Sequence, residues 1–185
     1  AIYAMDAKAH GKSDGKTITA PETAEMIKVL EDTFGRFNGF ISHSFGGISV
    51  ALHQELYNYP PARLVFIAPA TETATALDKF CEFFRLGKSI KSEMDNIIFE
   101  RAGVRANHYS IKRIIPKIKN PILWIHDEDD DITPLSDVKP LIDSNPQNVE
   151  FMITQGLGHR KIYKENKIQK KVLDFFHTKT EEKNL

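Results

Sequence analysis

The stretch GFISHSFGG, residues 39–47, is the part of the chain that decides the fold. A short apolar run ends near Ser42 and is followed by Ser44, Gly46 and a long helical pattern. Such a stretch predicts a strand that turns sharply into a helix, with Ser44 at the apex. Because the turn is tight, the residues two before and two after the apex must be small, as Ser42 and Gly46 are. The Ser44 hydroxyl would then stand clear of the sheet, beside the backbone N–H of Phe45.

A serine hydroxyl is a poor nucleophile by itself, so Ser44 requires a base and an orienting acid elsewhere in the chain. The strand-like run 122–126 ends in five consecutive acidic residues, 127–131. A second strand-like run, 149–154, ends in a glycine-containing loop that carries His159. The order is therefore serine, acid, histidine, and each member follows a strand pattern.

This chain resembles the α/β-hydrolase family, and the resemblance extends over almost its whole length. Residues 126–134, HDEDDDITP, are similar to the acid loop, which usually reads His-Gly-x-x-Asp-x-x-x-Pro. Three further segments match family motifs in order: the turn after an early strand (6–13, DAKAHGKS), the nucleophile elbow (42–47, with Ser42 where Gly is more usual) and the histidine loop (156–159, GLGH).

The resemblance implies a catalytic triad of Ser44, His159 and Asp130, with the Phe45 backbone N–H in the oxyanion hole. Asp130 follows from the register of the acid loop, in which Asp127 replaces the usual glycine. The alternative acid is the residue before Asp130, and the other acidic residues of 127–131 are expected to be solvated loop charges or turn formers.

Other candidate site residues carry weaker signals. Ser42 is the rival serine, but Phe40 rather than a glycine lies two residues before it. His43 and His126 are expected to be structural, and His10 is expected to shape its own turn. The acidic segment also matches the first positions of an EF-hand calcium loop, but Ile132 and Val138 occupy the demanding sixth and twelfth positions. No metal or organic cofactor is therefore expected.

The fold class expected is α/β: a doubly wound, mostly parallel sheet of the α/β-hydrolase type, because strand and helix patterns alternate. Residues 1–185 would form a single domain, with its core at 1–70 and 120–177. Residues 71–119 carry only helical patterns and would form a small cap, and 178–185 a polar tail. Cys81 lies among the apolar residues of the first helical pattern in this cap and is expected to be a packed thiol. The neighbouring Phe80, Phe83 and Phe84 would either pack together or line an acyl pocket.

The resemblance also implies strands that precede the early turn in the family, one of them with a His-Gly loop that completes the oxyanion hole. The chain begins at Ala1 in a strand-like run, 1–5, so an N-terminally incomplete sheet is expected. Either residues 1–5 would pair with 37–42, or the exposed edge would support self-association. A missing oxyanion donor typically lowers the rate by about 10²–10³, so the chain alone would be a poor hydrolase.

Composition excludes several classes of partner. Lys plus Arg and Asp plus Glu number 25 each, so the net charge is zero and neither nucleic acid nor an anionic membrane is indicated. The longest apolar run, residues 64–68, is far too short to cross a membrane. The single Cys81 excludes an internal disulfide and favours a reducing compartment, so a cytoplasmic location is expected.

The function expected is hydrolysis of a small-molecule ester or related acyl bond through an acyl-enzyme on Ser44. A serine at the apex disfavours the haloalkane-dehalogenase and epoxide-hydrolase branches of the family. Three alternatives stay open: an acyl transferase or a C–C bond hydrolase with the same triad, and an inactive or binding remnant.

Overall fold

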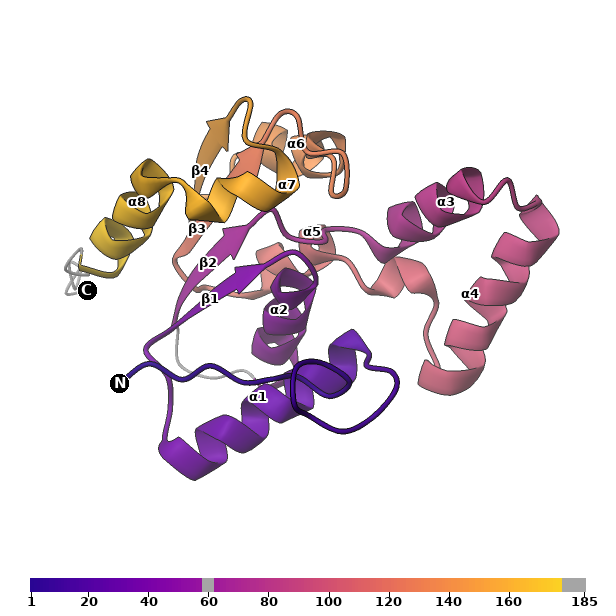
Figure 1. The fold of residues 1–185 in the computed structure, drawn as a ribbon, viewed down its shortest axis with the longest axis horizontal. Helices are drawn as coiled ribbons and strands as arrows, with labels where there is room; N and C mark the ends of the chain where they lie inside the picture. The colour runs from indigo at the N-terminus through magenta and orange to yellow at the C-terminus, as the bar shows by residue number, and fades with distance from the viewer. Residues whose placement is uncertain (58–61, 178–185) are drawn as a thin grey trace.

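A four-stranded, fully parallel sheet forms the centre of the computed structural model, which describes residues 1–57 and 62–177. Its strands lie side by side in chain order: β1 (Gly39–His43), β2 (Arg63–Ile67), β3 (Ile122–Asp127) and β4 (Val149–Thr154). Since the strands are parallel, their carboxyl ends meet at one edge of the sheet, and the loops that leave this edge carry the candidate site residues (Figure 1). The expected tail at 178–185 lies outside the described residues.

Helices cover both faces of the sheet, so the prediction of a doubly wound α/β fold is confirmed. One face packs mainly against α1 (Ala20–Phe34), α2 (Phe45–Tyr57), α5 (Ile111–Ile114) and α6 (Leu135–Ser144). The opposite face packs mainly against α8 (Asn166–His177). The remaining helices are α3 (Thr73–Phe83), α4 (Lys88–Ala102), α7 (Gly158–Lys161) and three short 3₁₀ turns, η1 (Ala106–His108), η2 (Ile115–Lys117) and η3 (Ile162–Lys164).

The core follows from the alternation of side chains along the two central strands. Phe66 and Trp124 lie on the face covered by α1, α2, α5 and α6, with their ring centroids 5.6 Å apart. Val65 and Leu123 face α8 on the other side. All six residues of β3 are buried, as an apolar strand between two helical layers requires.

The first long helix begins where its sequence predicts. The Thr19 hydroxyl accepts the backbone N–H of Glu22, and the Glu22 carboxylate accepts the backbone N–H of Thr19, which forms a capping box. Pro21 lies in the first turn, and Gly35 ends the helix with a φ of 88°. This helix packs against α2 and so supports the helix that follows Ser44.

Residues 1–5 do not form the strand that the sequence analysis expected, and β1 pairs with β2 rather than with them. Tyr3 instead stacks on Phe34 at 4.6 Å between ring centroids and lies 5.3 Å from Phe37. A strand needs a neighbour for its backbone groups, whereas this segment is held through its aromatic side chain at the end of α1. The expected pairing of 1–5 with 37–42 is therefore wrong.

Residues between β2 and β3 are helical, and α3 and α4 project away from the sheet (Figure 1). An isolated antiparallel bridge between Glu72 and Ser110 joins the two ends of this segment. Cys81 is buried and free, as expected. Phe80 and Phe84 contact each other at 4.8 Å between ring centroids, and both are exposed together with Phe83, which is 80% exposed.

No helix in the described part of the chain is long and apolar enough to cross a membrane.

Candidate active site

Ser44 lies at the sharp turn between β1 and α2, as its sequence predicts. Its φ of 54° is unusual for a residue other than glycine and places it at the apex of the strand-to-helix turn. A Cβ built on Gly46 would lie 3.5 Å from the Cβ of Ser42, so these two positions face each other across the turn. Ser42 is buried and donates its hydroxyl to the Val65 carbonyl at 3.1 Å, which leaves Ser44 as the serine at the apex.

Gly47 is a further requirement of this turn. A Cβ on Gly47 would lie 2.4 Å from the Cβ of Pro69, in the loop after β2. Only glycine therefore allows α2 to approach that loop so closely. The backbone N–H of Ala70, in the same loop, donates to the Ser44 carbonyl at 2.9 Å, which fixes the loop to the apex.

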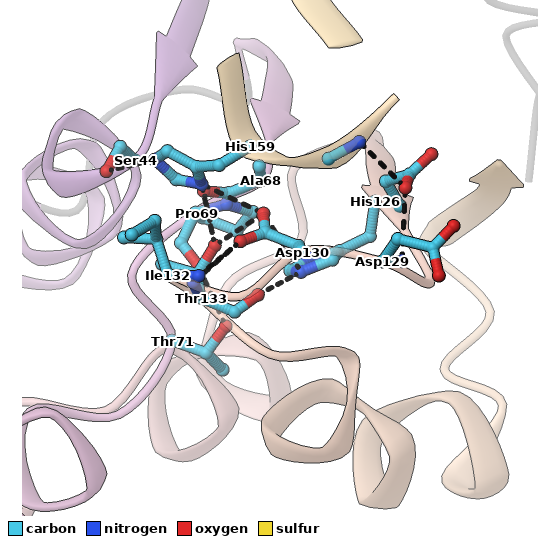
Figure 2. Close-up of polar contacts among 12 residues, drawn as sticks. Ser44, Ala68, Pro69, Thr71, His126, Asp129, Asp130, Ile132, Thr133 and His159 are labelled. Atoms are coloured by element: carbon cyan, nitrogen blue, oxygen red, sulfur yellow. Dashed lines mark hydrogen bonds and ion pairs between the residues drawn. The ribbon is translucent and has the colours of Figure 1, made fainter. Parts of the chain in front are cut away.

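His159 lies in α7, at the end of the loop that follows β4, and is buried. Its Nε2 is 3.0 Å from the Ser44 Oγ, and its Nδ1 is 2.8 Å from the Asp130 Oδ2. Figure 2 shows the imidazole ring between these two residues. An ionised carboxylate can only accept, so Nδ1 carries the proton and Nε2 is left free to accept from the Ser44 hydroxyl.

Asp130 is the carboxylate that reaches this histidine. It is buried, and its Oδ1 accepts the backbone N–H groups of Ile132 and Thr133 at 2.9 and 2.8 Å. The Thr133 hydroxyl lies 2.9 Å from the Asp130 Oδ2. Burial alone would raise the pKa of Asp130, but the hydrogen bonds from His159 and Thr133 outweigh it and lower that pKa. Asp130 therefore stays ionised beside the imidazole.

Asp129, the alternative acid, has a different partner. Its Oδ2 accepts the backbone N–H of Gly156 at 2.8 Å, in the loop that precedes His159. Figure 2 shows the Asp129 carboxylate away from the His159 ring. Of the two candidates, the structure thus brings Asp130 to the imidazole and Asp129 to the histidine loop.

His126 fixes the acid loop from within the core. Trp124 Nε1–H donates to its Nδ1 at 3.3 Å, and its Nε2–H donates to the Thr133 carbonyl at 2.6 Å. Burial lowers the pKa of His126, so the ring stays neutral with both nitrogens bonded. Sequence reasoning missed Thr133, although a threonine three residues after an aspartate is a known pattern for side-chain to backbone hydrogen bonds.

His43 contacts His159 through a hydrogen bond to its backbone and through its ring. Its Nε2–H donates to the His159 carbonyl at 3.0 Å, and the two rings lie 4.6 Å apart between centroids. The Tyr163 ring lies 4.8 Å from the His43 ring. Burial lowers the pKa of His43, which favours the neutral ring.

Asp127 was expected to be a solvated loop charge or a turn former. It is not solvated, because its side chain is fully buried. Its carboxylate accepts from four donors: the Thr154 hydroxyl at 2.6 Å and the backbone N–H groups of Gly158 at 2.9 Å, Asp129 at 3.1 Å and Leu157 at 3.2 Å. Glu128 and Asp131 are exposed, as expected.

The early turn, residues 6–13, is mostly exposed, and Asp6 holds both of its ends together. The Asp6 carboxylate accepts the Lys12 N–H at 3.0 Å, and the Asp6 carbonyl accepts the Ser13 hydroxyl at 2.6 Å. His10 Nδ1 lies 3.0 Å from the Lys8 carbonyl, within the same turn.

Within residues 1–57 and 62–177, no three His, Cys, Asp or Glu side chains are grouped so that they could hold a metal ion.

Comparison with protein-family models and with curated protein sequences gave no match. Solved structures do match. An α/β-hydrolase called MGS-M2, from a Medee basin deep-sea metagenome library, aligns with 95% of this chain and 79% of its own, with 18% identity and a TM-score of 0.67.

Two further matches have similar scores. A monoacylglycerol lipase of Paleococcus ferrophilus aligns with 91% of this chain and 79% of its own, at 16% identity and a TM-score of 0.63. An esterase of Exiguobacterium antarcticum aligns with 91% of this chain and 78% of its own, at 15% identity and a TM-score of 0.63. At these identities the likeness establishes the fold, and the chemistry has to be argued from the site.

Proposed function

We propose that this chain, which has the α/β-hydrolase fold, hydrolyses an ester or related acyl bond through Ser44, His159 and Asp130. The observation that carries the proposal is the line of hydrogen bonds from Asp130 through the His159 ring to the Ser44 hydroxyl, at 2.8 and 3.0 Å. A nucleophile, a base and an acid that orients the base are the parts that acyl transfer requires.

In the first half of the reaction, His159 Nε2 takes the Ser44 proton while the Ser44 Oγ attacks the substrate carbonyl carbon. The imidazolium that forms is stabilised by the Asp130 carboxylate, which keeps its negative charge. His159 then gives the proton to the leaving alkoxide, and the acyl group remains on Ser44. In the second half, water repeats these steps and releases the acid.

The negative charge on the substrate oxygen needs hydrogen-bond donors. Phe45 is the first residue of α2, and the first N–H groups of a helix have no acceptor within the helix. We assign the Phe45 N–H as one donor, since it directly follows Ser44. The positive end of the α2 dipole favours the same charge.

A small-molecule ester is the substrate class that we propose. Solved structures with this fold include esterases and a monoacylglycerol lipase, which supports carboxylic ester chemistry in general. We also propose that residues 71–119 act as a cap, because this helical segment begins directly after the loop that contacts Ser44.

The test combines covalent labelling with turnover. We expect a fluorophosphonate probe to label Ser44, and the protein to hydrolyse a short-chain p-nitrophenyl ester slowly, because only one oxyanion donor is assigned. Ser44→Ala should abolish both while leaving the unfolding midpoint nearly unchanged, because the hydroxyl at the apex is not part of the core.

Ser42→Ala is the matched control, because it removes a neighbouring serine hydroxyl that is bonded to the Val65 carbonyl. This variant should still be labelled. Labelling of Ser44→Ala at the wild-type level would exclude Ser44 as the nucleophile.

A further inference from the structure

We propose that Asp127 is a positioning residue whose buried carboxylate fastens the backbone of the histidine loop, residues 156–159, and thereby sets the place of the His159 ring between Asp130 and Ser44. This inference rests on the proposed function for its kinetic consequence. Its structural consequence, the geometry of His159, can be measured without turnover.

The contacts of Asp127 join two loops that are far apart in the sequence. Asp127 is the last residue of β3, and its Oδ1 accepts the N–H groups of Gly158 and Asp129. Its Oδ2 accepts the Leu157 N–H and the hydroxyl of Thr154, the last residue of β4. One carboxylate therefore ties the acid loop to the end of β4 and to the middle of the histidine loop.

A carboxylate suits this position because it is the side chain that offers only acceptors. Its two oxygens can accept about four hydrogen bonds, and four donors converge on Asp127. Burial alone would raise the pKa of Asp127, but the hydrogen bonds from Thr154, Gly158, Asp129 and Leu157 lower it overall. Asp127 is therefore ionised at neutral pH, and its charge is stabilised by these donors.

The loop that Asp127 holds has little conformational preference of its own. Gly156 and Gly158 have φ angles of 82° and 57°, a backbone region that glycine enters about as readily as others. Asp129 adds a contact at Gly156, but it is exposed to solvent. His159 directly follows Gly158, so a change in the backbone conformation of this loop would displace the imidazole ring.

A small displacement of His159 is sufficient to reduce catalysis. The Ser44 Oγ lies 3.0 Å from Nε2, near the middle of the hydrogen-bonding range. Misplacement of a reacting group by about 1 Å can lower a rate by about 10². Loss of the Asp127 contacts should therefore act on kcat rather than on substrate binding.

Two substitutions at Asp127 distinguish the effect of losing all of its hydrogen bonds from the effect of losing only its charge. Asp127→Ala removes all of the contacts. In Asp127→Asn, the amide oxygen can still accept from Gly158 and Asp129, and the amide NH₂ can donate to the Thr154 hydroxyl, which also accepts. Only the Leu157 N–H loses its acceptor. Asp127→Asn should therefore recover much of what Asp127→Ala loses.

The kinetic readout uses a short-chain p-nitrophenyl ester. We expect Asp127→Ala to lower kcat by about 10- to 100-fold with KM changed by less than about three-fold, and Asp127→Asn to lower kcat by less than about tenfold. Val172→Ala is the control for lost stability, since Val172 is a buried apolar residue of α8 that is neither a member of the proposed triad nor a hydrogen-bond partner of Asp127. It should lower the unfolding midpoint without lowering kcat.

The structural readout is the downfield proton NMR signal of His159 Nδ1–H, assigned by its loss in His159→Gln. We expect this signal in the wild type, Val172→Ala and Asp127→Asn, and its broadening or loss in Asp127→Ala. If the wild type shows the signal but neither labelling nor turnover, and Asp127→Ala loses it, the proposed function fails and the role of Asp127 stands.

Two results would overturn the inference: a wild type without the signal, or an Asp127→Ala variant with both a wild-type signal and wild-type kcat. If Asp127→Ala does not fold, Asp127→Asn decides, because it must still differ from the wild type in kcat or in the width of the signal. Equality in both would overturn the inference.

Discussion

Around the ring of His159, single hydrogen bonds decide which nitrogen carries the proton. Asp130 Oδ2 accepts from Nδ1, while Asp130 Oδ1 is held by the N–H groups of Ile132 and Thr133. The carboxylate therefore cannot rotate without losing these bonds. At the scale of the residue, the site depends on an acceptor that is fixed in place and stays ionised.

Asp130→Asn should lower kcat far more than Asp131→Asn. The asparagine oxygen would stay with the N–H groups of Ile132 and Thr133, so its NH₂ would face His159 Nδ1. That nitrogen would then have to accept, and the ring proton would move to Nε2, where it prevents proton transfer from Ser44. Losses of about 10⁴ are typical of this change of tautomer.

Steady-state kinetics of the two variants would test this prediction. Asp131 is exposed and carries the same substitution without reaching the ring, so it is the control. A larger loss in Asp129→Asn than in Asp130→Asn would assign the acid to the neighbouring position.

At the scale of elements, α5 is attached to α2 through a cluster of charges. Arg113 donates from its Nη1 and Nη2 to the two oxygens of Glu55, and Lys117 lies 2.7 Å from the same carboxylate. Since α2 begins beside Ser44, this cluster connects the end of the segment 71–119 to the helix that follows the proposed nucleophile.

Glu55→Gln should lower the free energy of unfolding in a pH-dependent way. The hydrogen bond from Arg113, with support from Lys117, lowers the pKa of Glu55 from 4.5 to about 2. Because the folded state has the lower pKa, the stabilisation is complete above about pH 4.5 and is lost as the pH falls towards about 2. We expect about 1–2 kcal/mol at neutral pH, after allowance for solvent screening of a partly exposed pair.

Urea unfolding of the wild type and Glu55→Gln across this pH range would measure the difference. Glu100→Gln, at an exposed glutamate of α4, should behave as the wild type throughout. A difference between wild type and Glu55→Gln that grows as the pH is lowered would contradict the assigned pKa direction.

At the scale of the whole molecule, the position of β1 in the sheet bears on self-association. Among the described residues β1 pairs with β2 alone, so its other side forms an edge of the sheet. Ile41 in this strand is 61% exposed. Unpaired backbone groups beside an exposed apolar side chain favour pairing with another chain.

We expect the 185-residue protein to self-associate through β1, and Ile41→Lys to weaken this association. A lysine on an edge strand opposes pairing, because its charge would have to be desolvated or brought close to a second copy. Sedimentation velocity over a range of protein concentrations would measure the change. Val29→Lys is the matched control, since Val29 is also 61% exposed but lies on α1. A wild type that remains monomeric at every concentration would contradict the prediction.

The sequence by itself determined the order of strands and helices in the core and the serine at the apex of the turn. These features depend on residues that are close together in the chain. The run before Ser44 and the small residues around it specify the turn locally, and Thr19 with Glu22 specifies the start of α1 in the same way. The residues at β3 and β4 predicted an acid and a histidine at one edge because parallel strands place their carboxyl ends together.

Only the tertiary structure decided how the individual acidic residues are used and what residues 1–5 do. Asp127 and Asp130 have the same side chain, and the register of β3 against β4 places one beneath the histidine loop and the other beside His159. Residues 1–5 have a strand-like pattern, but a strand requires a neighbour, and Tyr3 stacks on Phe34 instead. The acid-loop register already favoured Asp130, but the burial of Asp127 and its hydrogen-bond partners arise from contacts between distant segments, so no local pattern indicated them.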